Sequence, residues 1–441
     1  MLYSRIKGVA ALKNIRQFLK KHTAALLLLA VALTLSTGTL WAKYAQNVTV
    51  TKGLNLTVTM ETKTYTVDKN KMRDALKALK DDAPTTLKFV KGNDAALTGL
   101  TSSASIQATG SGEIGVYLSA DKTTVYIAPS DGSSAVMYAP TNCSQFLYAD
   151  DKVLGSRQLT EINLVNLDTS HTTNMQDMFR GNWGLLVLSF GENFDTSNVT
   201  NMQYMFYSNK KLTSLDLSGF NTSNVTTMKA MFGGCDVLSA LDLRSFNTSK
   251  VADMNWMFHW CYALTSINFG QTFYTSNVTD MGAMFTNCRT LTSLDLSSFN
   301  TAKVKEMGLM FNGCENLEVI YAGESFNTKS YSSSSTRVFY DCTKLKGGAG
   351  TTYSDSRVNK TYARIDGGTA RPGYFTAKTS TSNAKTVSLD LSGLTKITAS
   401  TADDVQQPGA AEAAPSTGAA DTKTVWIDPR DLSNITADKA A

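Results

Sequence analysis

Apolar positions in the middle of the chain recur with a period of about 26 residues. The pair Met-Phe marks each recurrence, and Val338 with Phe339 forms a degenerate last copy. The steps between successive copies are 27, 26, 26, 27, 26 and 28 residues, counted between Met178, Met205, Met231, Met257, Met284, Met310 and Val338. A fixed period of this length is typical of a repeat protein, in which each unit buries its apolar face against its neighbours.

One unit, Leu212 to Val237, reads LTSLDLSGFNTSNVTTMKAMFGGCDV and contains two hydrophobic periods. In its first part Leu215 and Leu217 alternate with polar residues, which predicts a strand with one buried face. In its second part the apolar residues follow the spacing i, i+3, i+6, i+7 and i+10 of one helix face, at Val225, Met228, Met231, Phe232 and Cys235. We therefore expect each unit to consist of a strand, a turn, a short helix and a return.

Stacking such units predicts an α/β fold, a solenoid of about seven units of 26 to 27 residues. Its strands would align in a parallel sheet at a spacing of about 4.8 Å, and its two ends would need caps. The predicted core consists of Leu215, Leu217, Val225, Met228, Met231, Phe232, Cys235, Met254, Met257, Phe258, Cys261, Met281, Met284, Phe285, Cys288, Met307, Met310, Phe311 and Cys314.

The repeat LTSLDLSSFNTAKVKEMGLMFNGC, from Leu291 to Cys314, and its sister units resemble the repeats of BspA-like leucine-rich-repeat surface proteins of bacteria. The resemblance extends from about Gly115 to Phe375, and it includes a lead-in segment and a closing stretch that look like the caps of that family. It implies a horseshoe-like leucine-rich-repeat solenoid. It also implies a secreted or cell-surface protein that acts in adhesion and has no conserved catalytic residues.

The chain departs from the family pattern in a few units. Thr172 stands where Val199 stands in the next unit, Trp183 and Trp256 are local variations, and the last repeat loses both Met positions. These departures concern mainly the first and last repeats.

The sequence outside the repeats divides into distinct stretches. Residues 47–67 alternate as two strands would, and residues 69–80 have the pattern of an amphipathic helix. After Phe375 the chain is rich in Ala, Ser, Thr and Pro, as flexible tails are. The predicted organisation is a signal peptide or anchor (1–43), a small α+β region (44–112), an N-terminal cap and lead-in (113–158), the repeat array (159–343), a C-terminal cap (344–376) and a low-complexity tail (377–441).

The basic excess of the chain is concentrated at its start. The formal net charge is +5, but residues 1–43 hold seven of the 42 basic residues and no acidic one, which leaves 35 basic against 37 acidic residues. The rest of the chain is therefore not a basic nucleic-acid binder. Thr23 to Ala42 carry no charge and follow a basic segment, as in a secretory signal. We expect export to the cell surface or beyond, with this segment either cleaved or retained as the only membrane contact.

The outward side of the predicted sheet is the candidate ligand-binding surface. It carries a column of mostly small polar side chains, which suits a protein or a glycan: Asn163, Ser189, Asp216, Asp242, Arg244, Asn268, Asp295 and Tyr321. The alternative is that these residues only keep an exposed sheet soluble. Because Asp216 and Asp242 would repel each other, Arg244 or a calcium ion are two ways to compensate their charges.

Five cysteines recur in one column, four residues after the first position of each Met-Phe-like pair, where the earlier units have Asn182 and Asn209. This column runs through Cys235, Cys261, Cys288, Cys314 and Cys342. A thiol that alternates with an amide and repeats in every unit without histidine indicates a buried structural position, so we expect no metal site. Export would permit disulfides between units, and spacing alone leaves that alternative open.

Catalytic patterns are missing from the sequence. Only His22, His171 and His259 occur, and no nucleophile-elbow, zinc-protease, phosphate-loop or dinucleotide-binding pattern is present. We expect neither an enzyme nor a bound cofactor. A hydrolase within residues 45–112 is disfavoured because that stretch has no histidine or cysteine.

Two functions fit these observations. The first is an exported protein whose exposed strand face binds a host extracellular-matrix or cell-surface protein, a glycan or another bacterial cell. The alternative is a non-catalytic structural spacer of the cell envelope.

Overall fold

The computed structural model describes residues 63–107, 112–149, 158–327, 330 and 336–378, and the backbone of 45–48 and 58–61. All of them belong to one compact unit. The predicted signal or anchor segment and all but the first two residues of the predicted tail lie outside these residues. The described part is mostly sheet, and its single α-helix is α2 (Lys69–Ala78).

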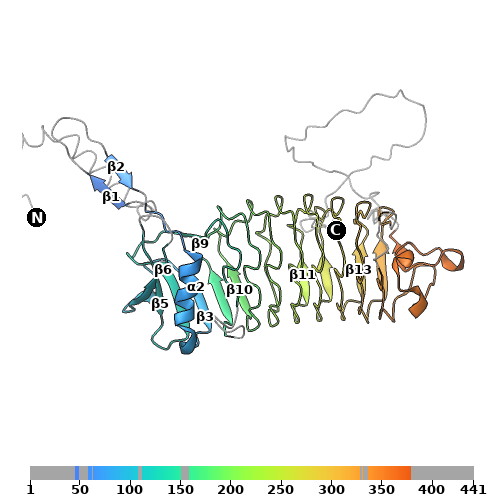
Figure 1. The fold of residues 1–441 in the computed structure, drawn as a ribbon, viewed down its shortest axis with the longest axis horizontal. Coiled ribbons are helices and arrows are strands. Elements are labelled where there is room, and N and C mark those ends of the chain that lie inside the picture. The colour runs from blue at the N-terminus through green and yellow to red at the C-terminus, as the bar shows by residue number, and fades with distance from the viewer. Residues whose placement is uncertain are drawn as a thin grey trace, which may run out of the picture. The chain divides into compact units, whose positions relative to one another are not determined.

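The region before the repeats combines α2 with a mixed sheet (Figure 1). Asp68 caps α2 by accepting hydrogen bonds from the backbone N–H groups of Asn70 and Lys71, and Met72 and Leu76 are buried, as the pattern predicts. The strands are β3 (Thr86–Phe89), β4 (Ser102–Ser105), β5 (Ile114–Leu118), β6 (Thr124–Pro129), β8 (Glu161–Leu164) and β10 (Val187–Phe190), in the spatial order β10-β8-β3-β6-β5-β4.

This sheet joins the N-terminal region to the first repeats. Strand β3 pairs in parallel with β6 on one side and with β8, the first repeat strand, on the other. Residues on both sides of the predicted boundary at 112/113 therefore belong to one sheet. Two shorter pairs complete the region: β1 (Ala45–Val48) with β2 (Val58–Glu61), and β7 (Met137–Tyr138) with β9 (Leu167–Asp168).

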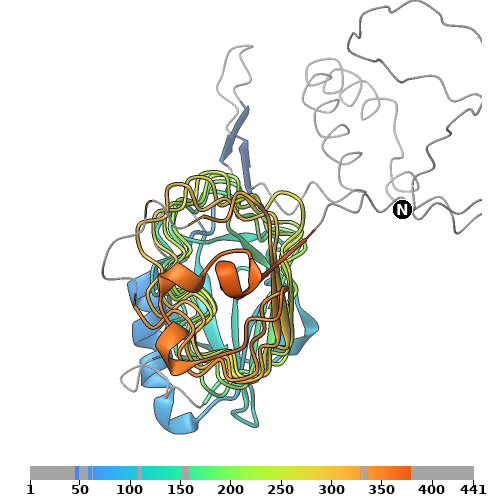
Figure 2. The same cartoon turned by 90° about the vertical axis from the view of Figure 1, so that its right-hand side faces the viewer.

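Each repeat is one turn of the chain, here called a coil, and the coils lie side by side with parallel strands (Figures 1 and 2). Seen down the row in Figure 2, they overlay one another. Equivalent residues are in register, as in the pairs Ser189↔Asn163, Asn268↔Asp242 and Tyr321↔Asp295. The later strands are β11 (Ala240–Asp242), β12 (Ser266–Asn268), β13 (Ser293–Leu296), β14 (Val319–Ala322) and β15 (Phe375–Ala377).

The prediction of a short helix in each unit is wrong, because the described repeats have turns at these positions. On the side of the core opposite the strands, successive described coils have one residue each that forms a single parallel bridge to a neighbouring coil, and turns follow it. We call this side of the stacked coils the turn side. The ladder of bridges runs through Asn142, Asn174, Asn201, Thr227, Asp253, Asp280 and Glu306.

Hydrogen bonding on the turn side explains why no helix forms. The N–H groups of Met228, Ala230, Phe232 and Gly234 donate to carbonyls of the next coil. Those of Met231, Gly233 and Cys235 donate to carbonyls three residues back. Ala230 and Gly234 have φ of 51° and 70°. These left-handed residues break the helical path, so the backbone bonds run between coils. The spacing i, i+3, i+6, i+7 buries the same residues in this conformation as it would in a helix.

The predicted core residues form one continuous cluster, in which all are buried except Leu215, which is partly buried. Phenylalanines of successive coils stack with ring centroids 5.4–5.8 Å apart, from Phe179 through Phe206, Phe232, Phe258, Phe285 and Phe311 to Phe339. Each coil therefore covers the apolar face of its neighbour.

Buried threonines of the FNT stretches add a second link between coils. The Thr222 hydroxyl donates to the carbonyl of Asn247 at 3.0 Å and accepts from its N–H at 2.8 Å. Equivalent pairs join Thr196 to Asn221 and Thr301 to Asn327. This exchange satisfies backbone groups where the coil turns a corner.

The C-terminal end is closed by β15, which pairs with β14, and by the buried carboxylate of Asp366. Burial would raise the pKa of Asp366, but hydrogen bonds from Thr351 and from the N–H groups of Gly368 and Ala349 hold that pKa below its ordinary value. Gly368 begins the short 3-10 helix η7 (Gly368–Ala370), and η5 (Asp355–Arg357) and η6 (Lys360–Tyr362) precede it in the chain. The 3-10 helices η3 (Lys80–Asp82) and η4 (Ala95–Leu97) lie in the N-terminal region.

Candidate binding surfaces

The strand face predicted to bind ligand lies on the outer side of the repeat strands. Asp216, Asp242, Asn268 and Asp295 are exposed, and Tyr321 is 37% exposed. Asn163 and Ser189 at the N-terminal end are half-buried, while Arg244 is exposed beside Asp242. The residues that sequence reasoning chose therefore share one face, with the small polar character expected of it.

A structural role explains most of this column. The Oδ1 atom of Asp216 accepts the backbone N–H of Ser218 at 3.0 Å, and Asp295 accepts that of Ser297 at 3.0 Å. Asn163, Asp242 and Asn268 each accept the N–H two residues ahead in the same way. These Asx turns give the Asp or Asn of five coils a role in local backbone geometry, whereas Ser189 and Tyr321 occupy the same column in two other coils.

The charges of the strand face are also compensated locally. Arg244 pairs with Asp242, its Nη2 lying 2.6 Å from Oδ2, and Lys378, which directly follows β15, pairs with Asp295. Hydrogen bonds lower the pKa of Asp216 and of Asp242 below the ordinary value. Among the described residues, no three His, Cys, Asp or Glu side chains gather as cation ligands would.

One hollow of about 730 Å³ opens at the N-terminal end of the strand face. It lies between the N-terminal region and the first two coils, and Lys88, Asn163, Val165, Phe190 and Glu192 are among its lining residues. Val165 is 55% exposed there.

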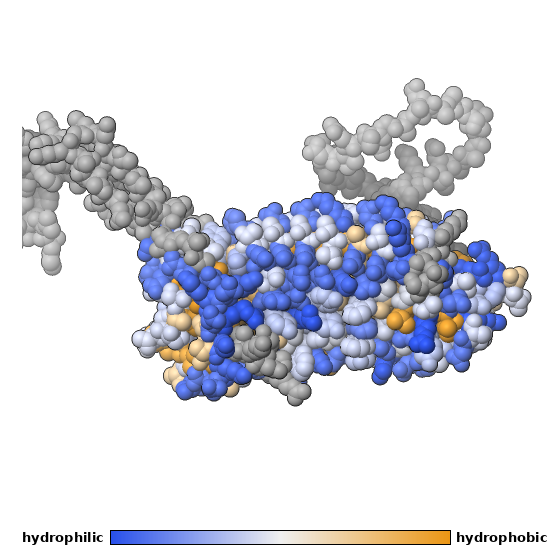
Figure 3. Space-filling view, viewed as in Figure 1, coloured by the Kyte–Doolittle hydropathy of each residue, from blue (hydrophilic) through white to orange (hydrophobic). Residues whose placement is uncertain are grey.

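Over the row of coils, the face drawn in Figure 3 is mostly hydrophilic, with hydrophobic patches towards both ends.

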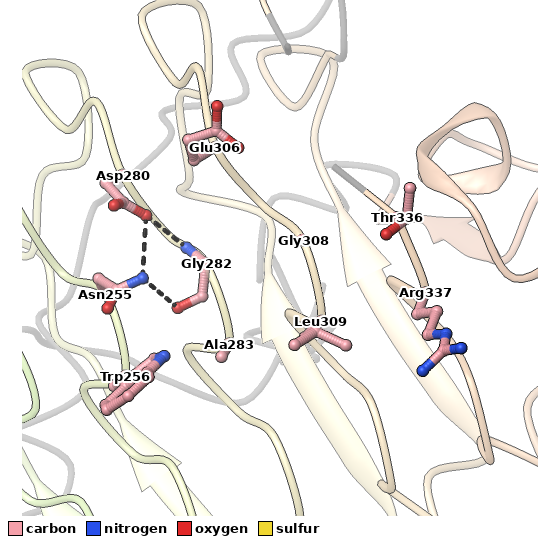
Figure 4. A pocket seen from close by; sticks show the side chains of 10 residues that line it. All are labelled: Asn255, Trp256, Asp280, Gly282, Ala283, Glu306, Gly308, Leu309, Thr336 and Arg337. Carbon is pink, nitrogen blue, oxygen red and sulfur yellow. Dashed lines mark hydrogen bonds between the residues drawn. The ribbon is translucent and has the colours of Figure 1, made fainter. Parts of the chain in front are cut away.

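A second hollow, the turn-side groove, has a volume of about 560 Å³ and crosses the coils that contain Trp256, Ala283, Leu309 and Arg337. Figure 4 shows these four residues along one side of it and Asp280 with Glu306 along the other. Its volume falls within the 300–1,000 Å³ range of small-ligand sites.

The floor of this groove is made of glycine. Gly282 and Gly308 occupy a column in which the other coils have Gln176, Gln203, Lys229, Asn255 and, in the last coil, Thr336. The hollow exists because two adjacent coils lack the side chain that fills this column elsewhere.

An aromatic cluster adjoins the groove. Trp256 and Trp260 are 39% and 42% exposed, and the ring of His259 lies between them, with centroids 5.2 and 4.3 Å away. Burial lowers the pKa of His259 to about 4, so its imidazole is neutral at physiological pH. Its buried Nδ1 has no hydrogen-bond partner among the described residues. The neutral ring of His259 packs against both tryptophans. Because its pKa is far below physiological pH, it is a weak general base.

Aromatic and arginine side chains recur along the turn side. Arg180 lies 5.0 Å above the ring of Tyr204 and 5.1 Å above that of Tyr207, and Arg337 lies 5.7 Å above the ring of Tyr340. These residue types are enriched at the anchoring positions of protein interfaces. The strand face has only Tyr321 and Arg244 of this kind among its predicted site residues.

Sequence reasoning missed the turn-side groove. It treated Trp256 as a local variation, and it assigned the turn segments to helices whose outer faces had no predicted role. The available signal was the pair of glycines in neighbouring units, at a column that otherwise carries polar side chains.

The cysteine column is buried and unpaired. All six cysteines are free, and the thiols of Cys235, Cys261 and Cys314 donate to the carbonyl of the core phenylalanine in the preceding coil, at 3.1–3.3 Å. Asn182 donates its amide to the carbonyl of Leu147 in the preceding coil at 2.9 Å, as the thiols do in the later coils, which explains the exchange of amide and thiol. Burial raises the pKa of Cys235 to about 12, so the thiolate needed for metal ligation is disfavoured.

No helix in the described part of the chain is long and apolar enough to cross a bilayer.

Comparison with known proteins gives one family. Residues 151–269 and 241–353 are similar to the family described as "Mycoplasma protein of unknown function, DUF285". No curated protein and no solved structure matches the chain. The two matched ranges overlap and together span a little under half of the chain, all within or beside the repeat array, so this chain is similar to that family in its coils.

Proposed function

We propose that this chain is an exported, BspA-like leucine-rich-repeat solenoid that mediates adhesion through its outer surface and performs no catalysis. Its partners would be host matrix or cell-surface proteins, glycans or other bacterial cells. The N-terminal apolar segment would direct export, either as a cleaved signal or as an anchor.

One observation supports this proposal above the others. Exposed aromatic and arginine side chains, including Trp256, Trp260 and Arg337, stand on a rigid stack of hydrogen-bonded coils. Tryptophan and arginine are enriched at the anchoring positions of interfaces, and a tryptophan on a rigid element loses little conformational entropy when it binds. A pure spacer has no need to expose three large aromatic or guanidinium groups beside a hollow.

The spacer hypothesis is the second candidate, and the strand face favours it. The Asx turns of Asp216 and Asp295, together with the Arg244–Asp242 pair, account for that face without any ligand. The two candidates therefore differ in whether any exposed face contributes to binding.

An adhesion assay separates them. Cells that carry the full chain and cells that lack it are compared for attachment to a panel of matrix proteins, glycans and bacterial cells. We expect attachment to at least one surface only when the chain is present. Equal attachment by both cell types would leave the spacer as the better account, and recovery of the protein in the cytoplasmic fraction would overturn export.

A further inference from the structure

We propose that the turn-side groove binds a neutral oligosaccharide, with one sugar ring packed on Trp256. This proposal rests on the proposed adhesive function and names the ligand class of one site.

The glycine floor is explained by space and not by backbone conformation. Gly282 and Gly308 are absent from the described residues with positive φ, so neither needs to be glycine for its backbone conformation. A Cβ atom at Gly282 would lie 2.8 Å from the Asn255 amide nitrogen and 3.1 Å from Asp280 Oδ1. Glycine at this position keeps the hollow open and leaves the Asn255 amide in place.

The polar side presents oriented hydrogen-bonding groups. Asp280 Oδ1 accepts from the N–H of Gly282 at 2.8 Å and from the Asn255 amide at 3.2 Å, and the same amide donates to the Gly282 carbonyl at 3.0 Å (Figure 4). These bonds fix the carboxylate before any ligand arrives. A carboxylate oxygen that remains available accepts from hydroxyl donors, which sugars carry at nearly every carbon.

The apolar side offers a flat surface. Trp256 is 39% exposed, and its ring stacks on His259 with an interplanar angle of 17°, which holds its orientation. Ala283 and Leu309 continue this side in the next two coils, so Trp256 and Leu309 stand about 10 Å apart at the usual spacing of parallel strands. This side therefore extends over more than one ring, while the C–H face of a sugar packs on the indole.

The charges on the groove favour a neutral ligand. Asp280 and Glu306 would repel an anionic ligand, and Arg337 at the end of the groove would oppose a cationic one. A neutral polyol gains from both, because its hydroxyl groups donate to carboxylates and accept from the guanidinium. A lysine-rich peptide is the main competing ligand, and the experiment includes it.

Direct binding to the full-length protein tests the proposal. A panel of neutral oligosaccharides and a lysine-rich peptide are titrated by calorimetry, and ligand-observed NMR identifies the ring protons in contact. Trp256→Leu removes the aromatic surface, and Trp260→Leu is its matched control, since Trp260 is similarly exposed but does not line the groove. Gly308→Gln fills the floor with the side chain that Gln203 supplies in the same column, and Lys229→Gln is its control.

We expect at least one oligosaccharide to bind, with Trp256→Leu and Gly308→Gln weakening its binding at least tenfold and both controls staying within twofold of the parent. Thermal melts establish that the variants fold. The proposal is overturned if no oligosaccharide binds, if Trp256→Leu binds as the parent does, or if only the peptide binds with this mutational pattern. Cells that adhere as well with Trp256→Leu as with the parent would leave adhesion intact and remove the groove from it. Sugar binding by a protein that supports no adhesion would keep the groove as a sugar site and overturn the proposed adhesive function.

Discussion

The strand face and the turn side of the same coils use their polar residues differently. On the strand face, turns and ion pairs within the chain already engage the carboxylates of Asp216, Asp242 and Asp295. On the turn side, Asp280 is also held by local bonds, yet it borders a hollow with an exposed tryptophan opposite. A repeated polar residue is therefore weak evidence of binding, because the repeat itself can require it. A break in the repeat, such as Gly282 and Gly308, is the stronger signal.

The largest effect should come from the core that both sides share. Met231 is completely buried, so Met231→Asp places a charge among apolar side chains and should destabilise the coils by more than about 4 kcal/mol, enough to unfold them. Circular dichroism melts measure this effect. Met231→Leu keeps the apolar volume and should stay within about 1.5 kcal/mol of the parent. A native-like melt for Met231→Asp would disprove the burial of Met231 in the core.

The threonine links should come next. Thr222→Val leaves the N–H and the carbonyl of Asn247 without their partner and should cost about 2 kcal/mol in urea unfolding. Thr226→Val is the control, because Thr226 is exposed and its hydroxyl makes a single bond to the carbonyl of Thr200. Equal costs for the two substitutions would mean that the buried exchange adds nothing.

Acid should act on the turn side through His259. The unfolded chain protonates this histidine near pH 6.5, whereas burial keeps it neutral in the folded chain down to about pH 4. Between these values the unfolded state binds more protons, so the free energy of unfolding falls as the pH drops. Allowing for the partial exposure of His259, we expect the parent to lose about 1–2 kcal/mol relative to His259→Phe over this interval. Parallel stability curves for the two proteins would contradict the assignment.

The smallest effect should come from the strand face. Asp216→Ala removes the acceptor of its Asx turn and should cost about 1 kcal/mol, while Asp216→Asn keeps that acceptor and should cost less than half as much. Urea unfolding of both variants gives the difference. If Asn and Ala were equally destabilising, the charge of Asp216 and not its turn would be the important property.

Much of the fold could be predicted from the sequence, because burial follows the apolar period whatever the backbone does. Val225, Met228, Met231, Phe232 and Cys235 are all buried, although the expected helix is absent. The helix prediction failed because i, i+3 and i+7 spacing is shared by a helix face and by a chain that turns twice through left-handed residues. Only the bonds between coils, which join residues 25 to 27 apart, distinguish the two.

The candidate site was less predictable for a related reason. Side chains from four coils form the groove, and a gap in a column is visible only when the coils are stacked in register. The strand-face residues could be found because they alternate within one strand. Their bonds to the N–H two residues ahead could not be inferred from alternation alone.

One adhesion experiment tests the central comparison most directly. Cells displaying the parent, Trp256→Leu, or the triple variant Asp216→Asn, Asp242→Asn, Asp295→Asn are measured on the surface to which the parent attaches best. The triple variant keeps the acceptor atoms of the Asx turns and removes the strand-face charges, so all three proteins should fold. The account predicts that Trp256→Leu loses most of the attachment and that the triple variant retains it. Loss of attachment in the triple variant with full attachment of Trp256→Leu would contradict it.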